Sequence, residues 1–424
     1  MDIIIGAGVS GISYANFTKS EYIILEKEKE IGGYCRTIKK DGYVWDYSGH
    51  FFHFRNSDIK SIVTRNISPE ELNMVEKRTQ ILYKDQYVDF PFQKNIHQLE
   101  KKEFIDCLYD LFSVKKLTED VKSFKDMVYA NLGKSIADKF LIPYNQKLYA
   151  CDLDLLDSGA MGRFFPKASK EEIILNFKNS CHNNSYNSFF VYPKGGAIEY
   201  INSLFKNLNE EKVFLSEEVL SIDVCKKEVK TNRRMLNYDN LISTIPFPDL
   251  LQKCNIKYDS NIFTWNKVLV FNLGFDKKGS ETKNSWIYIP DSDIIFYRVG
   301  FYDNIMGTDK MSLYVEIGFA KDTVNINIEA YLERVLFDLK KKGIVTDQKL
   351  VSYNSVLMDP AYVHINRRSI DTVNELKKRL ALNNVFSIGR YGSWTYCSIE
   401  DNIIEAQELT RYLNGEKCCV DKTL

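Results

Sequence analysis

The chain has 424 residues, enough for two or three domains, and its 44% hydrophobic and 27% charged content are those of a soluble globular protein. Basic and acidic residues both number 57, so no net charge would attract nucleic acid or an anionic membrane surface. No apolar run reaches the ~20 residues that span a bilayer, and no basic segment resembling a signal peptide precedes the first apolar residues. We therefore expect a cytoplasmic protein without a membrane span.

The nine cysteines are scattered and form no C-x-x-C pair, which is typical of reduced thiols in a cytosolic protein. His50 and His53 are three residues apart, but no further ligands follow at the spacing of a zinc site. We expect no metal.

Residues 1–26 predict a strand, a glycine turn, a helix and a second strand that ends in an acid. In "GAGVSG", Gly6 permits the tight turn, Gly8 lets the backbone approach a pyrophosphate, and Gly11 lets helix and strand pack closely. Glu26 is placed to accept hydrogen bonds from a ribose, while the diphosphate would lie at the helix N-terminus. This pattern predicts a dinucleotide site and leaves NAD and FAD both open.

Three further motifs favour FAD. "KEKEIGGYCRT", with Gly33 and Arg36, resembles the second signature of glutathione reductase-type flavoproteins, particularly the amine oxidase and UDP-galactopyranose mutase branches. "YDNLISTIP" resembles the strand that returns to the nucleotide domain, and "VFSIGRYGSW" resembles the C-terminal turn that closes over the flavin. The cofactor contacts that this resemblance implies are Gly6, Gly8, Gly11, Glu26, Lys27, Gly33, Arg36, Gly49, Val219, Gly389, Arg390 and Asp401.

The middle of the chain contains a segment with a helical pattern and a later segment with a strand-like pattern. Residues 98–184 are mainly helical in pattern; in "LEKKEFIDCLYDLF" we expect Phe104, Ile105, Leu108, Leu111 and Phe112 on one buried face. Residues 265–320 hold aromatic-rich, strand-like runs such as "KVLVFNLGF" and "SLYVEIGF". We predict an α/β protein with a Rossmann-type FAD-binding domain, a helical insertion and a mostly antiparallel β-sheet substrate domain. The predicted boundaries are 1–75, 188–262 and 378–415 for the FAD-binding domain, 98–187 for the helical domain, 76–97 and 263–377 for the sheet domain, and 416–424 for a C-terminal tail.

Several segments resemble UDP-galactopyranose mutases, more closely the eukaryotic type. "IPYNQKLYACDLDLLDSGAMGRFFP" resembles the segment that ends in an arginine for the substrate diphosphate, which implies that role for Arg163. It also implies that Asn145 and Tyr149 face the nucleotide sugar. "SWIYIPDSDIIFYRVGFYDN" resembles the strand pair with a second diphosphate arginine, Arg298, and places Tyr288 near the nucleotide.

The remaining matches lie in short loops. "DPAYVHI" and "GRYGSWTYCSIEDN" align Tyr362 and Tyr396 with tyrosines that bind the substrate diphosphate. "SGHFFHF" resembles the histidine loop, in which Gly49 and His50 approach the flavin ring; we expect His53 to be structural. The resemblance thus implies His50, Arg163 and Arg298 as catalytic residues.

The resemblance implies an FAD-dependent pyranose–furanose mutase acting without net redox change. In that family, N5 of reduced FAD attacks the anomeric carbon and expels the nucleoside diphosphate, and arginine suits phosphate oxygens because its planar fork binds two at once. NADPH or NADH would keep the flavin reduced, and the product would supply surface polysaccharide. UDP-galactose is the default substrate; UDP-N-acetylgalactosamine, a dTDP- or GDP-linked deoxy sugar and a heptose stay open, as does a homo-oligomeric state.

The sequence departs from the mutase pattern at three places near the sugar and the nucleotide. Ser48 stands where glycine is common, Tyr149 where tryptophan often stands, and "CSIEDN" is one residue short. These departures bear on the identity of the sugar and of the nucleotide more than on the reaction type. Because the FAD motifs are shared more widely, two alternatives remain: an oxidase or desaturase of the amine oxidase and protoporphyrinogen oxidase group, and a flavin-binding module without catalysis. Each arginine has the alternative of a surface ion pair, and each tyrosine that of a buried aromatic residue.

Overall fold

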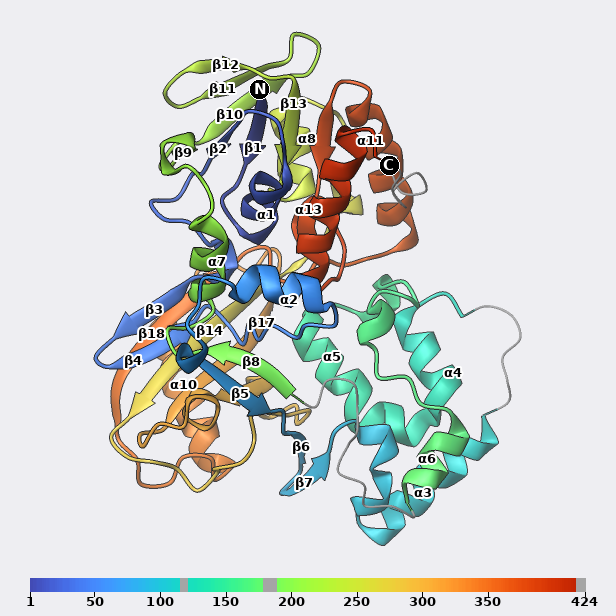
Figure 1. Cartoon of the computed structure of the whole chain (residues 1–424). Helices are drawn as coiled ribbons and strands as arrows, with labels where there is room; N and C mark the ends of the chain where they lie inside the picture. Colours follow the sequence, from blue (N-terminus) through green and yellow to red (C-terminus); the bar gives the residue numbers. More distant parts are fainter. Residues whose placement is uncertain (115–120, 178–188, 417–424) are drawn as a thin grey trace.

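A five-stranded parallel sheet organises the two ends of the chain (Figure 1). The computed structural model describes residues 1–114, 121–177 and 189–416. The strand order is β19-β13-β1-β2-β9, and every neighbouring pair is parallel. The strands are β1 (Asp2–Ile5), β2 (Tyr22–Leu25), β9 (Val213–Phe214), β13 (Asn240–Ser243) and β19 (Val385–Ser387). The predicted strand–turn–helix–strand unit is confirmed, and "YDNLISTIP" and "VFSIGRYGSW" supply β13 and β19.

Helices and small sheets surround this parallel sheet. Helix α1 (Val9–Phe17) follows the glycine turn and packs against α13 (Ile399–Leu413) and α7 (Ile198–Phe205). A three-stranded antiparallel sheet of β10 (Val219–Asp223), β11 (Glu228–Thr231) and β12 (Met235–Asn237) follows β9. The other helices of this part are α2 (Ser57–Thr64), α8 (Phe247–Lys253), α11 (Arg367–Ala381) and α12 (Gly389–Gly392). Two further pairs of strands, β3 (Thr37–Lys40) with β4 (Tyr43–Asp46) and β5 (Leu72–Glu76) with β8 (Phe189–Pro193), lie away from the parallel sheet, and side chains of β4, β5 and β8 share a hydrophobic cluster with strands of the seven-stranded sheet described next (Figure 1).

A seven-stranded sheet forms the lower left of Figure 1. Its order is β18-β14-β17-β16-β15-β6-β7, antiparallel except where β15 meets β6. The strands are β6 (Thr79–Tyr83), β7 (Gln86–Asp89), β14 (Asn266–Phe275), β15 (Trp286–Tyr288), β16 (Arg298–Phe301), β17 (Ser312–Ala320) and β18 (Leu350–Met358), with α9 (Tyr302–Met306) and α10 (Ile328–Lys341) beside them. Side chains on both faces of β14 are buried, which explains the continuous apolar run of its sequence.

Four helices form the insertion at the lower right of Figure 1: α3 (Lys101–Ser113), α4 (Phe124–Ile136), α5 (Ile142–Tyr149) and α6 (Lys170–Asn176). Only part of the apolar face expected on α3 is buried. Cys107 and Leu111 are fully buried, whereas Ile105 and Phe112 are 52% and 57% exposed. At 3.6 residues per turn, positions 104, 107, 108 and 111 share one face, and positions 105 and 112 lie one step around the helix.

The predicted fold class is confirmed: a Rossmann-type parallel sheet, a helical insertion and a mostly antiparallel sheet are all present. No helix among the described residues is long and apolar enough to cross a membrane. Six of the nine cysteines fall within the described residues, and all six are free thiols. The predicted tail at 416–424 lies, beyond Glu416, outside the described residues.

Candidate functional site

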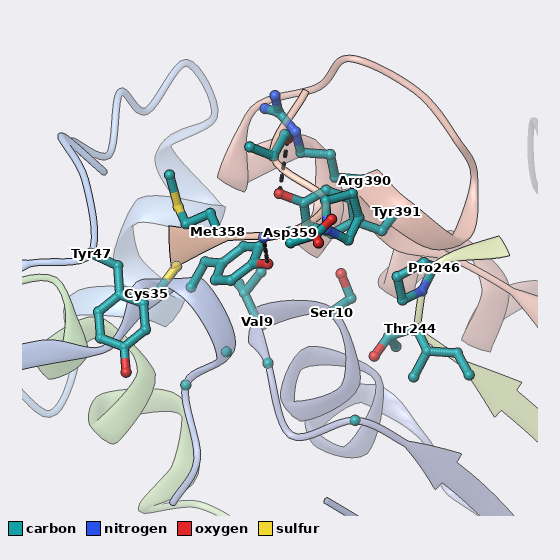
Figure 2. A pocket seen from close by; sticks show the side chains of 18 of the residues that line it. Val9, Ser10, Cys35, Tyr47, Thr244, Pro246, Met358, Asp359, Arg390 and Tyr391 are labelled. Atoms are coloured by element: carbon teal, nitrogen blue, oxygen red, sulfur yellow. Dashed lines mark hydrogen bonds between the residues drawn. The ribbon is translucent and has the colours of Figure 1, made fainter. Parts of the chain in front are cut away.

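A cavity of about 1090 Å³ lies at the carboxyl edge of the parallel sheet, the usual ligand edge of such sheets. Figure 2 shows residues from the start of α1 (Val9, Ser10), from the end of β13 (Thr244) and from α12 (Arg390, Tyr391) around this space. The predicted cofactor residues that line it are Gly6, Gly8, Glu26, Lys27, Gly33, Arg36, Gly49, Val219 and Arg390. The structure thus brings together residues from five distant segments of the chain.

Two glycine turns meet at the entrance to α1. A methyl group built on Gly8 would lie 3.9 Å from Cα of Gly33, so both backbones are bare on the sides that face each other. Gly8 is also the N-cap of α1 and provides no capping side chain, which leaves the first N–H groups of the helix free for an anion. The carboxylate of Glu26 accepts hydrogen bonds from the backbone N–H groups of Ala7 (2.7 Å) and Glu28 (2.9 Å), which fixes both turns. This cradle fits a dinucleotide diphosphate.

A second cavity, of about 630 Å³, is lined by residues of the helical insertion and of the seven-stranded sheet. It contains the predicted substrate residues Asn145, Arg163 and Tyr288. The carboxamide oxygen of Asn145 is buried and has no hydrogen-bond partner among the described residues, while its nitrogen donates to the Leu141 carbonyl (2.7 Å). Six predicted residues line both cavities: Gly49, His50, Arg298, Tyr362, Arg390 and Tyr396. The two spaces therefore share a wall made of predicted site residues.

Arg298 lies in this wall and is held by Glu316. The two residues are directly opposite on β16 and β17, and Tyr288 on β15 continues the same row. Nε of Arg298 donates to Oε2 of Glu316 (2.8 Å) and Nη2 donates to Oε1 (2.5 Å). Ser48 also donates a hydrogen bond to Glu316, which gives the serine of the histidine loop a structural function. Burial opposes ionisation of Glu316, but the charge of Arg298 outweighs it and lowers the pKa of this carboxyl.

The other two arginines differ in their partners. Arg163 is 42% exposed and forms an ion pair with Asp401 at the start of α13. Arg390 has no carboxylate partner among the described residues; its Nη1 donates to the Cys397 carbonyl (3.3 Å), and its Nε is buried without a partner. Of the three, Arg390 therefore carries the least compensated charge in the shared wall.

Two tyrosines stack against Arg390. The rings of Tyr362 and Tyr396 are nearly parallel with centroids 5.9 Å apart, and Cζ of Arg390 lies 5.1 Å and 4.7 Å from them. The backbone N–H of Tyr362 donates to Oδ1 of Asn266 (2.7 Å), which fixes the loop that carries it. Burial raises the pKa of Tyr362, so its hydroxyl stays protonated and can donate to a phosphate oxygen.

The histidine loop lines both cavities through His50 and only the second through His53. Burial, and then the positive charge of Arg390, lowers the pKa of His50 to about 4. Burial, and then Lys77, lowers the pKa of His53 to about 4. Nδ1 of each imidazole is buried with no hydrogen-bond partner among the described residues. Both rings are therefore neutral at pH 7.

Four predicted residues line neither cavity. Gly11 allows close packing as predicted, since a methyl group on it would lie 2.0 Å from the Gly6 carbonyl oxygen. Gly389 adopts a positive φ of 87° beside Ser10. Tyr149 was expected to face the nucleotide sugar, but it is 1% exposed and packs edge-on beneath Tyr362, with centroids 5.8 Å apart.

Asp401, the fourth of these residues, was expected to contact the cofactor, but its carboxylate is bound by other groups of the protein. Its carboxylate caps α13 by accepting from the Ser398 N–H (2.7 Å), and it also binds Arg163 and Arg55 (3.0 Å). The next residue, Asn402, lines the first cavity instead, and its Oδ1 accepts from Ser10 (3.1 Å) and from the Arg390 N–H (2.7 Å). Asn402, and not Asp401, is thus the residue of this pair that lines the cavity.

Sequence reasoning also missed residues that lie in the second cavity or behind its wall. Glu316 is one of these, although a single glutamate within the apolar strand "SLYVEIGF" is a usable signal. Lys77 and Phe140 lie in no motif, whereas Tyr144 and Trp286 lie within two of the segments quoted above but were given no role there. Phe140 belongs to the π-helical segment Ala137–Leu141 between α4 and α5, a geometry common at functional sites. Among the residues described, no three His, Cys, Asp or Glu side chains lie together as metal ligands would.

Comparison with known proteins is consistent with this architecture. Residues 4–65 match the family described as an NAD(P)-binding Rossmann-like domain. The structure is similar to that of a reduced UDP-galactopyranose mutase, with a TM-score of 0.90 and 22% identity over 98% of this chain and 95% of the other. It is also similar to a protein assigned as a protoporphyrinogen oxidase from Exiguobacterium sp. 255-15, with a TM-score of 0.80 and 15% identity over 98% and 99% of the chains. The cyclohexylamine oxidase from Brevibacterium oxydans IH-35A gives a TM-score of 0.69 and 12% identity over 98% of each chain. The chain thus has the fold of these proteins, built around a Rossmann-like nucleotide-binding domain.

Proposed function

We propose that this protein is an FAD-dependent nucleotide-sugar mutase that interconverts pyranose and furanose rings. The observation that carries the proposal is the shared wall between the two cavities, where Arg298, Arg390 and the stacked tyrosines meet His50. A mutase needs its flavin next to the anomeric carbon and cationic donors beside the departing diphosphate, so adjoining cavities with shared lining residues fit this function. The resemblance to UDP-galactopyranose mutase supports the same assignment.

The first cavity would hold FAD, with its diphosphate at Gly8 and Gly33 and its adenosine ribose near Glu26. Reduced FAD supplies a nucleophile when bound. Around it, neutral His50 excludes water without adding charge, and Arg298 and Arg163 present N–H donors toward a diphosphate. Tyr362 and Tyr396 add hydroxyl donors, and Asn145 offers an unpaired acceptor to the nucleotide.

The proposal extends to the biological role of the product, the reductant of the flavin and the cellular compartment. The product would be a furanose donor for surface polysaccharide, and NADPH or NADH would keep the flavin reduced in the cytoplasm. UDP-galactose is the default substrate. An oxidase of the amine oxidase or protoporphyrinogen oxidase group is the competing assignment, because the second cavity is also rich in aromatic side chains such as Phe140, Tyr144 and Trp286.

The proposal is tested with purified protein loaded with FAD and reduced by dithionite under nitrogen. UDP-, dTDP- and GDP-sugars are incubated with reduced and with oxidised protein, and products are separated by chromatography and identified by NMR. An isomer of unchanged mass that forms only with reduced protein supports the mutase. No isomer from any sugar, together with flavin reduction by amines or porphyrinogens, would replace it with the oxidase.

A further inference from the structure

Lys77 lies in the second cavity without a counter-charge. It follows β5 and precedes β6, and its Nζ lies 5.9 Å from the ring centroid of Trp286. Among the described residues it forms no hydrogen bond and no ion pair, and burial lowers its pKa. Lys77 is half-buried, so its ammonium group is poorly compensated and an anionic ligand beside it would be stabilised.

The other cations of the second cavity are better compensated. Arg298 is bound by Glu316, Arg163 by Asp401, and Arg55 by Glu400 and Asp401. Arg390 has no carboxylate partner but lies in the wall shared with the first cavity, against the stacked tyrosines. Lys77 is therefore the cation that lines the second cavity alone and has no acid beside it among the described residues.

The two histidines of the loop lie in different charge environments. The imidazole of His50 senses the positive charges of Arg390 and Arg298, whereas that of His53 senses Lys77. His53 packs edge-on against Phe190, and Phe190 packs against Trp286, so His53 and Lys77 lie around one aromatic cluster. Nδ1 of His53 is a second polar atom there without a partner among the described residues. This cluster is a subsite distinct from the arginines proposed for the diphosphate.

On the proposed function the anomeric carbon lies at the shared wall near His50, so a ring substituent on its far side extends into the second cavity, which His53 and Lys77 line. We propose that Lys77 and His53 form a subsite for an anionic substituent of this glycosyl group, so that the protein prefers a nucleotide sugar bearing a carboxylate to a neutral one. The inference rests on the proposed function for the identity of the ligand class. A carboxylate supplies the negative counter-charge that Lys77 lacks among the described residues, whereas neutral hydroxyl groups do not.

Calorimetric binding to the reduced, FAD-loaded protein tests this subsite. UDP, UDP-galactose and UDP-galacturonic acid are titrated into wild type, Lys77→Met and Lys77→Arg. We expect wild type to bind the uronic acid about 10- to 100-fold more tightly than UDP-galactose, as for a hydrogen bond between charged groups. Lys77→Met should abolish this preference and leave UDP affinity unchanged, and Lys77→Arg should keep part of it. Lys77→Met should also melt at the same or a higher temperature without ligand, which shows that the fold is intact.

The outcomes separate this inference from the proposed function. Equal affinity of wild type for both sugars, or an equal loss of UDP affinity in Lys77→Met, overturns the subsite and leaves the mutase standing. No binding of UDP itself overturns the proposed function, and the subsite falls with it.

Discussion

Arg298 and Glu316 form a two-pronged ion pair across adjacent strands, with both carboxylate oxygens engaged and the Glu316 side chain only 1% exposed. The arginine therefore has two functions: it compensates a buried negative charge, and it presents its remaining surface to both cavities. A change at Arg298 alters the stability of the sheet as well as the chemistry of the site, so the two effects have to be separated.

Arg298→Met should lower the free energy of unfolding by about 3–5 kcal/mol, because it leaves Glu316 buried and unpaired. The double variant Arg298→Met/Glu316→Gln removes both charges and should recover most of this loss. Urea denaturation measures both values. Turnover should stay low in both variants if Arg298 binds the diphosphate. A single variant as stable as wild type would contradict the structural importance of the pair.

Arg163→Ala should have the opposite profile. Its ion pair with Asp401 is partly exposed, and such pairs contribute about 0–1 kcal/mol. We expect a melting temperature close to that of wild type and retained flavin, but a loss of turnover of about tenfold or more, since a charged donor to the diphosphate is removed. Arg367→Ala, which removes another exposed pair far along the chain, is the matched control and should leave turnover unchanged. Full activity of Arg163→Ala would remove Arg163 from the site.

His53→Gln should change the response of the protein to acid. The pKa of His53 is about 4 in the fold and about 6.5 in the unfolded chain, so the unfolded chain binds more protons between these values. The free energy of unfolding therefore falls as the pH is lowered from 6.5 toward 4, by roughly 3 kcal/mol for one histidine. Urea midpoints at pH 7, 5.5 and 4.5 should decline less in His53→Gln than in wild type. Parallel declines would show that His53 is not buried as a neutral ring.

Gly8→Ala and Gly11→Ala should separate cofactor binding from folding. The methyl group on Gly8 meets only Cα of Gly33 at 3.9 Å, an ordinary contact, and therefore occupies the cradle without disturbing the chain. We expect Gly8→Ala to melt like wild-type apoprotein but to bind FAD about tenfold or more weakly, by titration of flavin fluorescence. On Gly11 the methyl lies 2.0 Å from a carbonyl oxygen, so Gly11→Ala should destabilise the apoprotein itself. Unchanged FAD affinity in Gly8→Ala would place the diphosphate elsewhere.

The parts of the site that depend on local backbone geometry were predictable. Gly6, Gly8 and Glu26 act within one strand–turn–helix unit, so their spacing alone predicts their placement at the edge of the sheet. The strand runs of the antiparallel sheet were equally clear, since "KVLVFNLGF" and "SLYVEIGF" became β14 and β17. Glycine spacing and apolar runs depend only on residues close together in the sequence, so they predict these elements without knowledge of distant contacts.

Features that depend on packing between distant segments were not predictable from sequence. The Arg298–Glu316 pair requires the register of β16 against β17, and the burial of Tyr149 involves a ring contact with Tyr362, 213 positions later. Asp401 and Asn402 could be told apart only once the phase of α13 was known. Lys77 carries no motif, and its significance comes from the absence of an acid nearby among the described residues.

The wall common to the two cavities links the affinities of their ligands. A molecule in the first cavity completes the surface that a second molecule contacts through Arg298, Arg390 and Tyr362. For the proposed mutase, the cofactor would bind first and the sugar nucleotide second. By thermodynamic reciprocity, the second ligand would then raise the affinity of the protein for the first by the same factor.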